Sequence, residues 1–245
     1  MKTIGLIGGM SWESTVTYYS EINETIKREL GGLHSAKIIM YSVDFHEIEQ
    51  LQHAGKWSEA GGVLARAAGS LQAAGADFLV ICTNTMHKVA EAVEQAATIP
   101  LLHIADPTAA AIKRDGHRRV GLLGTRFTME QPFYRERLAT AHSLEVIVPD
   151  SDDRQIIHQI IYEELCLGEI RDASRQAYRR IMQTLASNGA QAIILGCTEI
   201  SLLVSQDDAD VPLYDTTAIH ARAAALLALE DSPPVDGRRS ARVLS

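Results

Sequence analysis

Short runs of apolar residues alternate along the chain with longer segments in which apolar residues recur every three or four positions. The first pattern is typical of buried strands and the second of amphipathic helices. Strands are predicted at residues 3–7, 37–42, 78–82, 101–103, 119–123, 145–148, 192–195 and 212–214. Because helical segments separate them, the pattern favours an α/β fold with two sets of four mainly parallel strands flanked by helices.

Helices are predicted between these strands, among them residues 14–30, 57–74, 150–167 and 217–230. The first three are followed or ended by Gly31, Gly75 and Gly168. Glycine can adopt the positive φ that closes many helices, so these positions are expected helix ends.

The sequence contains an internal repeat. GLIGG from Gly5 resembles GLLGT from Gly121, 116 positions later, and GADFLVICTNT from Gly75 resembles GAQAIILGCTE from Gly189, 114 positions later. Because the two pairs of similar segments occur in the same order and at nearly the same offset, two related α/β lobes are expected. We expect residues 1–99 with 215–230 to form the N-terminal lobe, 100–214 the C-terminal lobe, and 231–245 a loose tail.

Small polar residues follow the repeated strands. They are Thr83, Asn84 and Thr85 in one copy, and Cys197, Thr198 and Glu199 in the other. Ligands of open parallel sheets bind beyond the carboxyl ends of the strands, so the two groups are expected to enclose one ligand from opposite sides. Their hydroxyls and amides suit a carboxylate, and the turn of residues 8–11, which includes Met10, adds further amides.

Composition and charge exclude several classes of protein. Apolar residues make up 46% and charged residues 22% of the 245-residue chain, as in ordinary globular proteins. The net charge of −8 and the lack of a Lys/Arg cluster before the tail argue against nucleic-acid or anionic-membrane partners. No apolar run approaches the ~20 residues of a membrane span. The N-terminus reads as a strand rather than a secretion signal, which predicts a cytoplasmic location.

Cys197 is the strongest catalytic candidate among the three cysteines. It is expected at a helix N-terminus, where the dipole and free N–H groups would lower the pKa of its thiol. The alternative is a small buried residue that closes a strand. Cys82 is expected in the core, and the position of Cys166 near a helix end favours no single role.

Other motifs are less informative. His87 would either reach the ligand or merely cover it, and covering is favoured. The histidines form no metal triad, and the cysteines lack the spacing of metal ligands or of a disulfide framework. GLIGGMS lacks the spacing of dinucleotide and P-loop motifs, so no nucleotide site is expected.

Four segments resemble those of the cofactor-independent aspartate/glutamate racemases. They are IGLIGGMSWEST at 4–15, CTNTMH at 82–87, LLHIADPT at 101–108 and LGCTEI at 195–200, and the resemblance covers residues 1–230. It implies two pseudo-symmetric lobes with the active site in the cleft between them, no pyridoxal phosphate, an amino-acid substrate and frequent homodimers. It also implies that one cysteine from each lobe moves the α-proton.

The chain departs from that family at the first of these cysteines, where it has Thr83. An unassisted Thr hydroxyl is a far weaker acid than a thiol, whose unperturbed pKa is ~8.5. We therefore expect Cys197 to remove the α-proton and Thr83 to return a proton or position a water molecule. In related racemases the second-lobe cysteine serves the L-enantiomer, which suggests conversion of L-Asp and L-Glu to their D-forms.

Two further departures concern the distal carboxylate of the substrate. Relatives often have a basic residue where this chain has Cys166, and some have Arg near Gln52. Loss of charge-assisted contacts predicts lower affinity or a broader substrate range. With both positions included, the expected substrate-binding residues are Met10, Gln52, Asn84, Thr85, Cys166, Thr198 and Glu199.

Two alternative functions remain open. The same cleft occurs in related enzymes such as hydantoin racemases, arylmalonate decarboxylases and maleate isomerases. The replacement of a catalytic thiol by Thr83 also allows a non-catalytic amino-acid-binding or regulatory protein.

Overall fold

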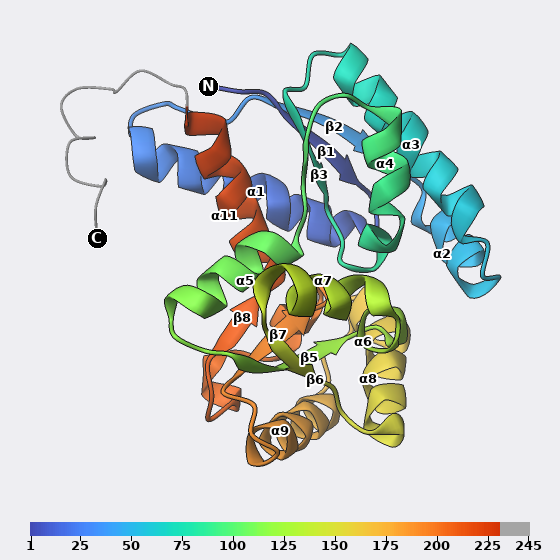
Figure 1. Cartoon of the computed structure of the whole chain (residues 1–245), viewed down its shortest axis with the longest axis vertical. Helices are drawn as coiled ribbons and strands as arrows, with labels where there is room; N and C mark the ends of the chain where they lie inside the picture. The colour runs from blue at the N-terminus through green and yellow to red at the C-terminus, as the bar shows by residue number, and fades with distance from the viewer. Residues whose placement is uncertain (231–245) are drawn as a thin grey trace.

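The computed structural model describes residues 1–230, which form two four-stranded sheets, both entirely parallel (Figure 1). The first sheet has the order β2-β1-β3-β4, with strands β1 (Ile4–Gly8), β2 (Ile38–Ser42), β3 (Phe78–Ile81) and β4 (Leu101–Leu102). The second has the order β6-β5-β7-β8, with strands β5 (Arg119–Gly124), β6 (Glu145–Ile147), β7 (Ala192–Gly196) and β8 (Leu213–Asp215). The predicted α/β class is confirmed, and every strand end lies within one residue of its prediction.

The strand order of the first sheet is repeated in the second. Residue Phe78 begins β3 and Ala192 begins β7, which keeps the 114-position offset of the sequence repeat. Thus β3 and β7 are equivalent strands, and so are β1 and β5. The ends of these equivalent strands carry the residues of interest.

Helices cover both faces of the first sheet. Its connections are α1 (Trp12–Leu30), α2 (Phe45–His53), α3 (Trp57–Ala73), η1 (Thr85–Val89) and α4 (Ala90–Ala96). One face packs on α1, where Tyr18, Ile22 and Ile26 are fully buried. The other packs on α2, α3 and α4, with Leu64 and Val93 fully buried.

The second sheet is covered in the same way. Its helices are α5 (Ala105–Arg114), α6 (Arg126–Glu130), α7 (Pro132–His142), α8 (Ser151–Glu163), η2 (Leu165–Leu167), α9 (Asp172–Ser187), α10 (Ile200–Leu203) and η3 (Gln206–Asp208). Helices α8 and α9 bury Ile157 and Ile181 on one face, and α5 and α7 bury Ile112 and Leu138 on the other. The helix predicted over 150–167 ends at Glu163 and continues only as the single turn η2.

The last helix, α11 (Thr216–Leu229), returns from β8 to pack along α1 (Figure 1). The backbone N–H of Lys2 donates to the carbonyl of Ala228 at 2.8 Å, so the first residues are tied to this helix. The chain therefore passes between the sheets twice, at residues 103–104 and at the start of α11. Assignment of 215–230 to the N-terminal lobe stays a prediction, and the tail predicted at 231–245 lies outside the described residues.

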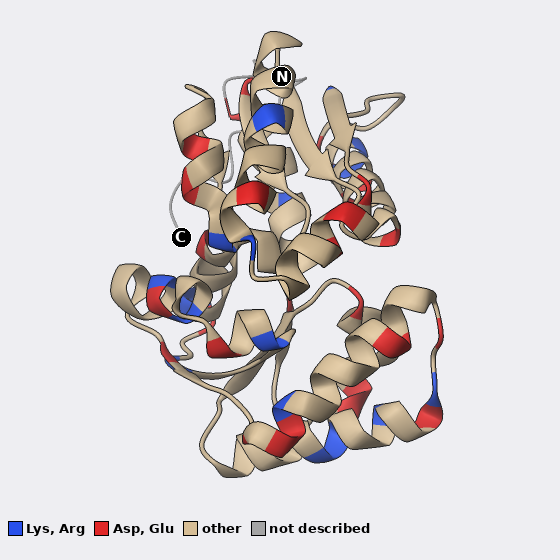
Figure 2. Cartoon of the chain, turned by 90° about the vertical axis from the view of Figure 1, so that its right-hand side faces the viewer, with Lys and Arg blue, Asp and Glu red and all other residues tan. Residues whose placement is uncertain are grey.

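Acidic and basic residues are interspersed over both halves, with no continuous basic face in the view of Figure 2. Among residues 1–230, no helix is long and apolar enough to cross a membrane. The same range contains no group of three or more His, Cys, Asp and Glu side chains arranged to hold a metal ion.

Gly9 allows the sharp turn from β1 into α1. Its φ is +89°, a conformation that costs L-residues free energy, and a Cβ there would collide with the backbone of Val43. The N–H of Gly9 donates to Oγ1 of Thr15 at 2.8 Å. This turn places Met10 and Ser11 beside the second lobe.

Candidate active site between the two sheets

A small cavity lies where the carboxyl ends of equivalent strands from the two sheets meet. Its volume is about 20 Å³, enough for about one water molecule. It is lined by Met10, Phe45, Gln52, Thr83, Thr85, Thr125, Ile161, Tyr162, Cys166, Cys197 and Glu199. The site is therefore closed in this structure, with walls from both halves of the molecule.

The two predicted catalytic residues line the same cavity from opposite halves. Thr83 lies just beyond β3, and Cys197 directly follows β7. Gly196 precedes Cys197, and a Cβ at this position would lie 2.8 Å from the carbonyl oxygen of Leu123, so glycine allows the ends of the paired strands β5 and β7 to lie close together. Cys82 is fully buried against the α1 side of the first sheet, as predicted.

Of the seven predicted substrate-binding residues, five line the cavity: Met10, Gln52, Thr85, Cys166 and Glu199. The other two are buried nearby. Asn84 donates through Nδ2 to Oγ1 of Thr216 at 3.0 Å, and its Oδ1 has no partner. Thr198 donates its hydroxyl to Glu199. Their roles in holding substrate stay predictions.

Glu199 is the most highly bonded side chain of the site. It is only 4% exposed. Its Oε1 accepts from Oγ of Ser11 at 2.8 Å, and its Oε2 accepts from Sγ of Cys197 at 3.0 Å and from Oγ1 of Thr198 at 2.6 Å. One carboxylate thus joins the β1–α1 turn of one half to the thiol of Cys197 in the other.

The expected low pKa of Cys197 is wrong for this closed site. Burial, and then the negative charge of Glu199, raise the pKa of the thiol well above its ordinary value. The helix that follows, α10, has only four residues and begins three positions later, at Ile200. Desolvation and a carboxylate therefore outweigh any dipole effect, and the thiol is protonated at neutral pH.

Further hydrogen bonds close the cleft across its width. Tyr162 donates its hydroxyl to Oε1 of Gln52 at 3.2 Å, and the hydroxyls of Thr85 and Thr125 lie 3.0 Å apart. Sequence reasoning missed Thr125 and Tyr162 as site residues. Thr125 occupies the position equivalent to Gly9 in the sequence repeat, and this equivalence could have identified it as a site residue. Tyr162 reaches the cavity through the packing of α8, which the local sequence does not reveal.

Aromatic rings from both halves meet beside Gln52 and Tyr162. The ring of Trp57 lies 5.1 Å from that of Phe127, and the ring of His53 lies 5.6 Å from that of Tyr162. Since α2 and α3 carry His53 and Trp57 while α6 and α8 carry their partners, this aromatic cluster spans the two halves. It adds apolar contact to the hydrogen bonds that close the cleft.

His87 contacts the backbone of Thr83 and does not line the cavity in this closed structure, so its predicted covering role stays a prediction. Its Nδ1 lies 2.7 Å from the carbonyl oxygen of Thr83, and its Nε2 accepts from the N–H of Ile104 at 3.2 Å. These partners require a proton on Nδ1 and none on Nε2. Burial, together with the nearby His103 and His220, lowers the pKa of His87 well below its ordinary value.

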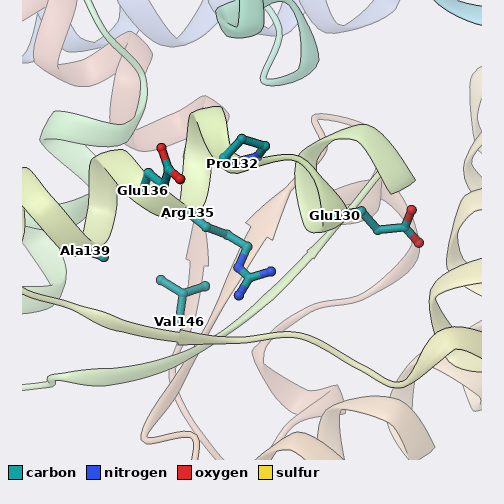
Figure 3. Close-up of a pocket in the computed structure, with 6 residues that line it drawn as sticks. All are labelled: Glu130, Pro132, Arg135, Glu136, Ala139 and Val146. Carbon is teal, nitrogen blue, oxygen red and sulfur yellow. The ribbon is translucent and has the colours of Figure 1, made fainter.

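The lining of the cavity contains one charged side chain, Glu199, and no cationic one. A larger hollow of about 270 Å³ lies elsewhere on the second half, around Arg135 and Val146 (Figure 3). None of its lining residues is a predicted site residue, and none carries a thiol or a hydroxyl group. The small cavity between the sheets is therefore the better candidate for catalysis.

The chain is similar to known proteins over most of its length. The profile of a family described as Asp/Glu/hydantoin racemase matches residues 7–224. The crystal structure of a proposed Asp/Glu racemase from Yersinia pestis is 62% identical, with a TM-score of 0.89 over 94% of this chain and 100% of that chain. An aspartate racemase homologue from Pyrococcus horikoshii OT3 is 35% identical, with a TM-score of 0.81 over 94% and 100%. The broad specificity amino-acid racemase RacX of Bacillus subtilis is 25% identical over 228 residues, 89% of this chain and 95% of RacX.

Proposed function

The chain is an isomerase of the Asp/Glu/hydantoin racemase family, and we propose that it converts L-aspartate and L-glutamate to their D-forms without pyridoxal phosphate. One observation carries this proposal. Thr83 and Cys197 line the same cavity from the ends of equivalent strands in two sheets of identical order. Inversion of an α-carbon needs one group on each face of the substrate, and this arrangement supplies them.

Cys197 is the base and Thr83 the donor in this proposal. The thiolate of Cys197 takes the α-proton of the L-amino acid, and the carbanion receives a proton from the side of Thr83, directly or through a water molecule. Hydroxyl and amide donors around the substrate carboxylate stabilise the carbanion. Thr85, Asn84 and Thr198 are the proposed donors, once opening of the cleft frees them from their present partners.

The test is exchange of the substrate α-proton in heavy water, followed by NMR, without added pyridoxal phosphate. The native protein should label L-Glu and L-Asp much faster than the D-forms. Cys197→Ala should abolish labelling, and Thr83→Cys should raise exchange of the D-forms. A fully active Cys197→Ala protein, or equal turnover of both enantiomers by the native chain, would exclude the assignment.

A non-catalytic amino-acid-binding protein is the second candidate, and the presence of Thr83 at a catalytic position favours it. The same experiment separates the two functions, because a binding protein would take up L-Glu without exchanging its α-proton. Other members of the superfamily differ in how they hold the substrate tail, and replacement of L-Glu by a hydantoin or an arylmalonate distinguishes them.

We further propose that the protein is a homodimer acting in the cytoplasm, where its thiols stay reduced. Helix α1 exposes Trp12, Val16 and Tyr19 at successive turns, and the edge strand β2 exposes Met40 and Tyr41. Exposed apolar residues along one helix are typical of interfaces. Light scattering coupled to gel filtration should give twice the chain mass.

A further inference from the structure

Glu199 is placed to act on the thiol rather than on the substrate. Its three hydrogen bonds come from Ser11, Cys197 and Thr198, and its side chain is buried. Of these donors, only the Sγ of Cys197 is a proposed reacting atom. A second carboxylate on the substrate side would also repel the acidic amino acids proposed above. The geometry therefore favours a role between Glu199 and Cys197.

A base must first lose its own proton, and the site limits where the proton of Cys197 can go. Release to water would leave a thiolate and a carboxylate about 3.0 Å apart in a buried site, which is strongly unfavourable. Transfer to Oε2 of Glu199 breaks the S–H bond and forms an O–H bond. The pair then carries one negative charge before and after the step, and no further reactant is needed.

We propose, on the basis of the racemase function above, that Glu199 accepts the thiol proton of Cys197 and does not bind substrate. The thiolate then takes the α-proton from the L-amino acid, which restores the thiol. The carbanion gains one proton from the side of Thr83, and Glu199 releases one proton to water when the product leaves. One proton enters and one leaves in each turnover, so the cycle balances.

The hydrogen bond from Ser11 links this proton transfer to substrate binding. Ser11 belongs to the first half of the molecule and Glu199 to the second, so their 2.8 Å contact spans the cleft. A cavity of about 20 Å³ cannot hold an amino acid, so the halves must separate to admit one. Loss of a donor makes a carboxylate more basic. When substrate replaces this contact and keeps water from the carboxylate, Glu199 therefore becomes a better proton acceptor.

The other titratable groups that face the pair are Cys166 from η2, Tyr162 from α8 and Tyr178 from α9. Burial raises the pKa of each of the three above its ordinary value, so all stay neutral near pH 7. The pH dependence of the reaction near neutrality then belongs to Cys197 and Glu199 as a pair.

The test compares the pH profiles of L-Glu α-proton exchange in the native protein, Glu199→Gln and Glu199→Asp. The native rate should be nearly constant between about pH 6 and 9, because the proton stays within the pair. Glu199→Gln keeps the shape of the side chain but removes the group that accepts the thiol proton. Its exchange rate should be about 100-fold below the native rate near pH 7 and should rise about tenfold with each unit of increasing pH. Glu199→Asp should keep the flat profile at a lower rate.

Glu91→Gln is the matched control, since it removes an exposed carboxylate from α4 that bonds only to Gln95. It should behave as the native protein. Alkylation of Cys197 by iodoacetamide, followed by mass spectrometry, measures thiolate formation independently of turnover. The alkylation rate should be nearly independent of pH in the native protein and should depend on pH in Glu199→Gln. Ser11→Ala should raise the native alkylation rate severalfold.

A native rate that rises tenfold per pH unit, or a Glu199→Gln protein with native rate and profile, would overturn the proposal. Misfolding of Glu199→Gln would leave the native profile, Glu199→Asp and the alkylation of Ser11→Ala as tests. Failure of the racemase function itself looks different. In that case the native protein would show no exchange, or Cys197→Ala would exchange as fast as the native protein, whatever residue 199 is.

Discussion

At the residue scale, the neutral lining of the cavity sets the expected substrate affinity. In the proposed function, Gln52 and Cys166 would face the distal carboxylate of L-Glu or L-Asp, and no Lys, Arg or His lines the cavity. Gln52 itself is buried and bonded to Met86 and Tyr162. Cys166 is only half-buried, so it is the better position at which to add a charge.

Cys166→Lys should therefore lower the KM for L-Glu by about tenfold, since a hydrogen bond to a charged group contributes about 1.5–3 kcal/mol. The KM for L-Gln should not fall, because its amide carries no charge. Steady-state kinetics with both substrates measures the difference. Cys166→Met is the control for side-chain length, and an equal improvement in that variant would rule out the electrostatic explanation.

At the element scale, α11 depends on a well-formed N-terminal cap. Oδ1 of Asp215 accepts from the N–H groups of Thr217 at 2.8 Å and Ala218 at 3.2 Å. The helix packs on α1 and carries the chain back to the first sheet. Loss of this cap would weaken an element that connects both halves.

Asp215→Ala should lower the free energy of unfolding by about 1 kcal/mol, the usual contribution of an N-cap side chain. Urea denaturation monitored by circular dichroism gives the value. Asp215→Asn keeps the acceptor and should stay within a few tenths of a kcal/mol of the native protein. If both variants lose the same stability, the carboxylate charge rather than the cap is responsible.

At the scale of the whole molecule, a cluster of buried histidines lies where the two halves join. The rings of His87 and His103 lie 4.4 Å apart, and that of His220 lies 5.9 Å from His87. Nε2 of His220 faces the carbonyl oxygen of Leu102 and Nδ1 faces the hydroxyl of Tyr18. Burial lowers the pKa of His103 to about 3 and that of His220 to about 4.

These low pKa values predict a loss of stability in acid. The pKa of His in an unfolded chain is near 6.5. Below that pH the unfolded chain therefore binds more protons than the folded chain, which lowers the free energy of unfolding. The stabilisation by these neutral rings is complete above about pH 6.5 and falls as the pH drops from there to about 4 for His220 and about 3 for His103, by an amount on the order of a few kcal/mol. Urea midpoints at pH 7 and pH 5 measure this loss.

His103→Asn isolates the contribution of one ring, because Asn keeps an acceptor for the N–H of Ala105. Its stability should fall less than that of the native protein between pH 7 and pH 5. His34→Asn, at an exposed position, should leave the pH dependence unchanged. An undiminished acid sensitivity in His103→Asn would exclude this ring as a cause.

Opening of the whole cleft should be visible in the fluorescence of Trp57. Its ring packs on Phe127 across the halves, and Nζ of Lys88 lies 3.8 Å from its centre. In a Trp12→Phe background Trp57 is the single tryptophan. Saturating L-Glu should change the emission of Trp57, both in this variant and in the same variant with Cys197→Ala added. Unchanged emission in a protein that turns over L-Glu would mean that substrate reaches the site without moving this contact.

The sequence by itself determined the strands, the parallel class and the internal repeat. The reason is local: a strand buried on both faces must be a short apolar run, and the polar residue after it marks the carboxyl end. Thr83 and Cys197 could be paired before any coordinates, because they fall at equivalent positions of the repeat, and Gln52 and Cys166 followed from the resemblance.

Only the tertiary structure decided the state of the thiol and the closure of the site. Ser11 and Glu199 are 188 positions apart, and no periodicity in the sequence predicts the hydrogen bond between them. The pKa of Cys197 was predicted in the wrong direction, because local spacing reveals a helix start but not the burial around it. Desolvation and charge pairing depend on which distant segments meet, and that is a property of the packed molecule alone.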